Sequence, residues 1–188
     1  MLKKLASNPN GAWNEHMAQK ITKQLLEGVE YLHGKKLVHL HLTHENVLLE
    51  EEDGRVVLSG FTLSKREGEQ EAVKGGNVNY QAPELLTQSG YGPETDMWSV
   101  GVFLFLLLTG RLAFFDNNRM KRNLKISKAT YSIDEDLSHH AKQFVAALLV
   151  AERGGRLSAS SALSHAWIQE KAPESPLAHV RALFASIE

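Results

Sequence analysis

The chain has 188 residues, 43% of them hydrophobic, and a formal net charge of -1. This length suffices for one domain with its own core, or for one large lobe of a bigger fold. The near-zero charge offers no basic footprint for nucleic acid or an anionic membrane. The absence of cysteine excludes disulfides, thiolate nucleophiles and cysteine zinc sites. The longest apolar stretch, at 100–108, is too short to span a bilayer.

The N-terminal half predicts one long helix followed by a hairpin. Asn14 is a suitable N-cap for a helix that runs to about His33 with one apolar face. Two short apolar runs follow, at 46–49 and 55–59, and the Asp-Gly pair between them predicts a β-hairpin. Residues 60–84 show no clear periodicity, which predicts a long loop.

The C-terminal half predicts further helices. An apolar helix opens at Pro93 and ends near Gly110, and its composition indicates that it is buried on all sides. The basic segment at 119–128 is typical of a solvated helix face. Ser138 caps the next predicted helix, and Ser158 caps another that continues through Trp167. The fold class expected is mainly α, with one small hairpin.

Pro173 and Pro176 mark a boundary near the C-terminus. We therefore expect a lobe at 1–171 and a tail at 172–188. Apolar residues recur at helical spacing over 177–187, which predicts an amphipathic tail helix that docks on another surface, for example within the same molecule.

Five stretches, in this order, resemble the C-terminal lobe of a protein kinase: YLHGKKLVHLHLTHENVLL, VVLSGFTLS, YQAPELL, YGPETDMWSVGVFLFLLLTG and LLVAERGGRLSASSALSHAWI. Within the kinases they are most similar to the calmodulin-dependent group, on the branch of myosin light chain kinase and the giant muscle kinases titin, twitchin and obscurin. TDMWS and Leu40 support this branch. The resemblance implies a kinase-like C-lobe, and no glycine-rich loop or nucleotide-anchoring lysine precedes the first helix. We expect the N-terminal lobe to be absent from the chain.

The resemblance also shows which catalytic groups are replaced. The catalytic aspartate falls on His41, and the lysine that meets the transferred phosphate falls on Thr43. The metal-binding aspartate of the DFG motif falls on Gly60, which offers no side-chain ligand to magnesium. The threonine before the Ala-Pro-Glu motif falls on Asn77, whereas the second magnesium ligand is retained as Asn46.

These replacements predict a pseudokinase that is not an enzyme and has no catalytic residues. Phosphoryl transfer depends on positioning and charge neutralisation around the phosphates, and the groups for both have changed. Asn46 and Leu48, which matches the support of an adenine ring, are then vestigial cofactor-binding positions, and we expect no cofactor.

The histidine-rich tract raises the alternative of a zinc site. His39, His41 and His44 carry suitable ring nitrogens. In the kinase geometry, however, His39 packs inward beside Phe61, and His44 replaces a proline on the outside. We therefore expect no metal and a structural role for His39 and Phe61.

Four further residues match groups that hold a kinase lobe together. The resemblance implies that Asp96 caps backbone amides of the catalytic loop, with Trp98 beside it. It also implies a buried ion pair between Glu84 and Arg156.

The function expected is that of a protein-interaction or scaffolding module, in the cytoplasm and associated with the cytoskeleton or sarcomere. A protein partner or the missing N-lobe would cover the exposed cleft face. The alternative is a fragment of an atypical Ser/Thr protein kinase with residual ATP binding or phosphotransfer. We expect neither nucleic acid nor membrane as a partner.

Overall fold

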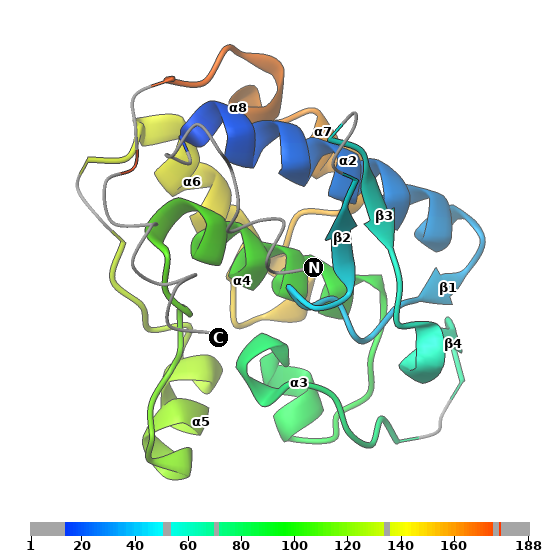
Figure 1. The fold of residues 1–188 in the computed structure, drawn as a ribbon. Coiled ribbons are helices and arrows are strands. Elements are labelled where there is room, and N and C mark those ends of the chain that lie inside the picture. Colours follow the sequence, from blue (N-terminus) through cyan, green and yellow to red (C-terminus); the bar gives the residue numbers. More distant parts are fainter. Residues whose placement is uncertain (1–13, 51–53, 70–71, 134–135, 175–176, 178–188) are drawn as a thin grey trace.

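The computed structural model describes residues 14–50, 54–69, 72–133, 136–174 and 177. The elements are α2 (Glu15–Gly34), β1 (Leu37–Val38), β2 (Val47–Leu49), β3 (Val56–Leu58), β4 (Lys65–Arg66), α3 (Pro83–Leu86), α4 (Pro93–Thr109), α5 (Arg119–Ser127), α6 (His139–Leu148), α7 (Ala159–Leu163) and α8 (Ala166–Gln169), with 3-10 turns at Phe61–Leu63, Val78–Tyr80 and Arg153–Gly155. One long helix, α4, runs through the middle, a second, α2, packs against it along the upper side, and shorter helices and a hairpin surround them (Figure 1). Helices make up about half of the structure, and two small antiparallel sheets accompany them.

Helix α2 begins and packs as its sequence predicts. The Asn14 side chain accepts a hydrogen bond from the amide of Met17 at 2.8 Å, which satisfies an N-terminal donor of the helix. Its buried face, including Ile21, Leu25 and Val29, packs against α4 and α7. This helix therefore forms one wall of the core.

Helix α4 is the buried axis of the lobe. Every residue from Thr95 to Thr109 is buried, as the apolar stretch at 100–108 predicts for the core of this helix. At Gly101 a Cβ atom would lie 2.8 Å from a Leu149 side-chain atom and 2.9 Å from the Cβ of Leu148, so only a glycine lets α6 approach this closely. No helix in the described part of the chain is long and apolar enough to cross a membrane.

The predicted hairpin is present, and a second small sheet accompanies it. β2 and β3 pair antiparallel, with Leu48 opposite Val57. The Gln24 side chain of α2 accepts a hydrogen bond from the amide of Val56 at 3.0 Å, which ties the hairpin to the helix. β1 pairs with β4, so part of the predicted loop at 60–84 is ordered as a strand. A two-residue pairing between distant segments leaves no periodicity from which it could be predicted.

The predicted helix from Ser158 through Trp167 is wrong, because the structure contains two short helices. α7 ends at Leu163, and the chain turns at Ser164 and His165. The His165 side chain then accepts a hydrogen bond from the Trp167 amide at 3.2 Å and caps α8. The break lets Trp167 point into the core against Phe144, with ring centroids 5.2 Å apart.

The residues after position 171 lie against the lobe where they are described. The carbonyl of Pro173 accepts a hydrogen bond from the His16 amide at 3.2 Å, and Ala172 and Leu177 are buried. The tail helix predicted over 177–187 lies outside the described residues except for its first position, Leu177. The division into a lobe at 1–171 and a tail at 172–188 stays a prediction.

Candidate functional site

The loop at 39–46 rests on the carboxylate of Asp96, in the first turn of α4. This carboxylate is fully buried and accepts hydrogen bonds from the amides of His39 and Leu40, both at 2.8 Å. The Nε2 atom of His33 lies 2.9 Å from the same carboxylate. Leu40 has a φ of 62°, a left-handed conformation that leucine rarely adopts and that costs roughly 1–3 kcal/mol. Asp96 thus holds the loop in a shape that it would not adopt alone.

His39 is completely buried, and both of its ring nitrogens are engaged. Nε2 donates to the carbonyl of Ser59 at 2.9 Å, and Nδ1 accepts from the amide of His41 at 3.2 Å. Its ring lies 4.6 Å from that of Phe61. Burial lowers the pKa of His39, and this effect exceeds the opposing influence of Asp96. A neutral imidazole satisfies both partners, so this ring supports the loop.

His44 does not lie on the outside as predicted. Its ring is half-buried, and Nδ1 lies 2.7 Å from the hydroxyl oxygen of Tyr80. The Tyr80 hydroxyl needs a hydrogen-bond partner because this tyrosine is buried, and the ring of His44 supplies it. Burial also lowers the pKa of His44.

The ring of His41 differs from its two neighbours because it makes no hydrogen bond within the described residues. Its Nδ1 atom is buried there without a partner. The described residues also contain no group of three His, Cys, Asp or Glu side chains arranged to hold a metal ion. Of the three histidines, His41 is therefore the one whose ring has no hydrogen-bond partner among the described residues.

His41, Asn46 and Gly60 lie together at one place in the structure. The Asn46 side-chain amide donates a hydrogen bond to the backbone carbonyl of His41 at 2.8 Å. Gly60 has a φ of 76°, and a Cβ atom placed on it would overlap the Asn46 carboxamide. The Asn46 side chain therefore occupies the volume that a larger residue at position 60 would need.

The oxygen donors at this place do not fit a magnesium ion held by the protein. Magnesium prefers carboxylate oxygens in octahedral geometry, and this position offers one neutral carboxamide oxygen, from Asn46. These residues therefore do not form a magnesium site held by the protein.

Thr43 and Asn77 face the same small hollow as His41. The hollow has a volume of about 10 Å³, roughly the space of one water molecule. Thr43 is buried, and its hydroxyl accepts a hydrogen bond from the Glu45 amide at 3.3 Å. The Asn77 side chain accepts from the Asn79 amide at 3.1 Å. Both side chains stabilise local turns, and neither extends into open solvent.

An apolar face lies beside these residues. Phe61 is 47% exposed, and Val57 on the hairpin is 39% exposed. Leu48, the vestigial position predicted from the sequence, is half-buried opposite Val57 in the β2–β3 register. An element that packed on this side of the hairpin would bury these side chains.

Glu84 and Arg156 form a buried, two-pronged ion pair. The two guanidinium NH2 groups of Arg156 donate to the two carboxylate oxygens of Glu84 at 2.7 and 2.8 Å. The guanidinium also lies 5.0 Å from the centroid of the Trp98 ring. Burial would raise the pKa of Glu84, but the hydrogen bonds and charge of Arg156 lower it. The pair joins α3 to the loop that follows α6.

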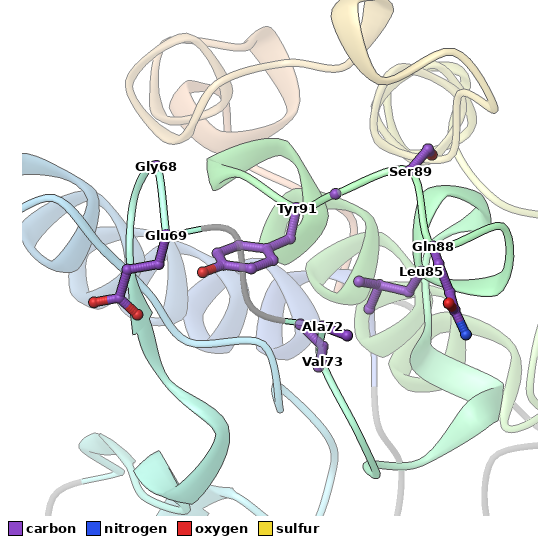
Figure 2. A pocket seen from close by; sticks show the side chains of 9 residues that line it. Gly68, Glu69, Ala72, Val73, Leu85, Gln88, Ser89 and Tyr91 are labelled. Atoms are coloured by element: carbon purple, nitrogen blue, oxygen red, sulfur yellow. The ribbon is translucent and has the colours of Figure 1, made fainter.

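A larger hollow lies away from the predicted site. It has a volume of about 460 Å³ and is lined by residues 68–69 and 72–73 on one side and by Leu85 and residues 88–91 on the other (Figure 2). Figure 2 shows the Tyr91 ring on one side, near Glu69, with Leu85 across from it. None of the site residues predicted from the sequence lines this hollow.

A loop held by a buried aspartate, a glycine–phenylalanine turn beside it and a buried glutamate–arginine pair together define a protein kinase fold. The chain belongs to the protein kinase domain family, whose sequence profile matches residues 1–168.

Several Ser/Thr kinases are similar to it. It is 36% identical over 174 residues to a serine/threonine-protein kinase H1 homolog of Pinctada fucata, covering 88% of this chain and 42% of that protein. It is 34% identical to a calcium/calmodulin-dependent protein kinase type 1 of Macrobrachium nipponense, covering 90% of this chain and 51% of the relative. It is 35% identical to myosin light chain kinase A of Dictyostelium discoideum, covering 85% of this chain and 57% of the relative. The chain thus spans about half the length of the curated relatives it matches.

These comparisons overturn the prediction that the chain is not an enzyme. The relatives are named protein kinases, and the similarity extends over most of the chain. The prediction rested on four replaced positions, His41, Thr43, Gly60 and Asn77. Phosphoryl transfer distributes its requirements over many positioning contacts, so these replacements do not by themselves define a non-enzyme.

Two further predictions are not confirmed. The family match begins at residue 1, so it does not support the absence of an N-terminal lobe. The relatives include a myosin light chain kinase, but the giant muscle kinase branch stays a prediction.

Proposed function

We propose that the chain is part of an atypical Ser/Thr protein kinase of the calmodulin-dependent group, which binds ATP and transfers its γ-phosphoryl group to a protein hydroxyl. The similarity to named kinases of this group carries the proposal. The loop at 39–46 and its support by Asp96 agree with it, because positioning of the reacting groups is one of the two requirements of this chemistry.

His41 is the residue we assign as general base. A neutral imidazole can accept the proton of a substrate hydroxyl while the hydroxyl oxygen bonds to the γ-phosphorus and ADP leaves. Its ring makes no hydrogen bond in the described part of the chain, whereas the rings of His39 and His44 do. Asn46 holds the backbone carbonyl of His41 and so positions this residue.

The apolar face formed by Phe61 and Val57 supports a second part of the proposal. These side chains are 47% and 39% exposed, and a kinase N-terminal lobe or a partner protein would bury them. The N-terminal lobe or partner would then complete the nucleotide cleft above His41. Alternatively, the apolar face serves only as a protein–protein contact.

A phosphate-transfer assay tests the proposal. The full-length protein, incubated with γ-labelled ATP, magnesium and a Ser/Thr peptide library, is expected to transfer label. His41→Ala is expected to lower the rate about 10²–10⁴-fold, the usual contribution of a general base. His139→Ala is the matched control, because His139 is exposed on α6 and is expected to leave the rate unchanged. Absence of both transfer and ATP-dependent thermal stabilisation would refute the proposal, and a fully active His41→Ala would refute the base assignment.

A further inference from the structure

Helix α5 exposes apolar side chains on the face that its sequence predicts to be merely solvated. Met120 is 82% exposed and Leu124 is 54% exposed, and the two lie one turn apart on the same stripe of the helix. Phe115, just before the helix, is also 54% exposed. Ile126 is buried instead, and α5 packs against α3. The exposed stripe is therefore separate from the contact that attaches α5 to the lobe.

The same helix carries positive charge that the described acidic residues compensate only in part, since Asp116 pairs with Lys125 and also interacts electrostatically with the nearby charge of Lys121. Arg119, Lys121 and Lys128 are exposed and form no ion pair with any described residue. Lys125, by contrast, lies 3.0 Å from the carboxylate of Asp116. The whole chain has a net charge of -1, so this concentration of positive charge is a local feature.

The helix is also held in a fixed shape. The Asn118 side chain accepts hydrogen bonds from the amides of Met120 and Lys121 at 2.9 and 3.1 Å, which caps the N-terminus of α5. Lys125 donates to the carbonyl of Phe115 at 3.1 Å, which fixes the backbone before the helix relative to its last turn. A surface that is ordered before binding loses less conformational entropy when a partner binds.

We propose that these residues form a docking face for a partner protein. The part of the partner that binds here is an acidic amphipathic segment. The α5 docking face consists of Phe115, Arg119, Met120, Lys121, Leu124 and Lys128. Apolar residues one turn apart on such a segment would pack on Met120 and Leu124, as anchors at this spacing do in helix recognition. Aspartate and glutamate residues beside them would pair with Arg119, Lys121 and Lys128, which adds charge complementarity and register.

An anionic membrane is the competing occupant, and the geometry disfavours it. A helix that lies stably in a membrane interface presents a broad apolar face or acts together with a second anchor. α5 has nine residues and exposes two of its apolar side chains. Two exposed apolar side chains, Met120 and Leu124, with basic side chains on the same helix fit a peptide better than a lipid surface.

The docking face is independent of the proposed phosphotransfer. Figure 1 shows α5 at the lower end of the molecule, away from the β2–β3 hairpin. None of its residues contributes to the loop at 39–46. A failure of ATP binding would therefore leave this proposal unaffected, and the reverse also holds.

Selection from a displayed library of random 16-residue peptides against the full chain tests the proposal. The expected result is enrichment of peptides with two apolar residues three or four positions apart and an excess of Asp and Glu. Labelled consensus peptides are then titrated by fluorescence anisotropy. The double variant Met120→Ser/Leu124→Ser and the single variant Lys121→Glu are each expected to weaken binding at least about fivefold.

Control variants on another helix test whether binding is specific to α5, and lipid vesicles test the membrane alternative. Tyr31→Ser removes another exposed apolar side chain, 66% exposed, and Lys23→Glu removes an exposed lysine, both on α2. Both controls are expected to retain binding, and circular dichroism checks that every variant is folded. Enrichment of basic peptides, binding insensitive to the α5 variants, or no enrichment would overturn the proposal. Binding to vesicles of phosphatidylcholine and phosphatidylserine without peptide binding would overturn it in favour of a membrane.

Discussion

Replacing Arg156 with alanine removes a guanidinium whose five N–H groups all have partners. Two of them bind the Glu84 carboxylate, and the other three bind the backbone carbonyls of Val150, Ala151 and Glu94, at distances from 2.7 to 3.1 Å. The variant leaves the buried Glu84 carboxylate with a single side-chain donor, the Thr95 hydroxyl at 2.9 Å.

The expected loss of unfolding free energy is about 3–5 kcal/mol, the usual consequence of leaving one member of a buried ion pair without its partner. For a chain of this length, each kcal/mol lowers the melting temperature by about 2–4 °C, which gives a decrease of roughly 6–20 °C. Differential scanning calorimetry and urea titration of the two proteins at pH 7 measure both quantities.

Arg153→Ala is the matched control, three positions earlier on the same loop. Its guanidinium lies 3.3 Å from the Glu94 carboxylate, and the two side chains are 37% and 39% exposed. Exposed pairs of this kind contribute about 0–1 kcal/mol, so this variant is expected to be nearly silent. If Arg156→Ala is as stable as Arg153→Ala, the ion pair does not hold the lobe together and the structural role of Glu84 and Arg156 is refuted.

Two further predictions concern the loop at 39–46 and its surroundings. Gly60→Ala and Gly75→Ala both place a side chain at positive φ, at roughly 1–2 kcal/mol each, but at Gly60 the new Cβ also overlaps the Asn46 carboxamide. We expect Gly60→Ala to be about 1–3 kcal/mol less stable than Gly75→Ala in urea titrations, and equal stabilities would show that Asn46 does not fill this space. Acidification should lower stability in two steps, because the pKa values of His39 and Glu84 are both lowered in the folded state. As the pH falls, the unfolded chain takes up these protons before the folded chain does, near the ordinary pKa values of 6.5 for histidine and 4.5 for glutamate, so the stability decreases. A stability that increases as the pH is lowered from 7 to 5.5 would contradict this account.

The sequence by itself determined the features that local chemistry controls. Asn14 and Ser138 cap their helices through hydrogen bonds to amides at most three residues away, so the helix starts could be predicted. The Asp-Gly turn predicted the hairpin, and the uniformly apolar composition of 100–108 predicted a buried helix. The order of the motifs was enough to indicate the kinase fold.

The tertiary structure decided what depends on contacts between distant segments. It showed that His39 and His44 are hydrogen-bonded to Ser59 and Tyr80, which leaves the ring of His41 without a partner in the described chain. Such pairings join residues 20 to 36 positions apart, and no periodicity encodes them. The exposure of Met120 on α5 was equally hidden, because composition does not reveal which face of a short helix the rest of the fold covers.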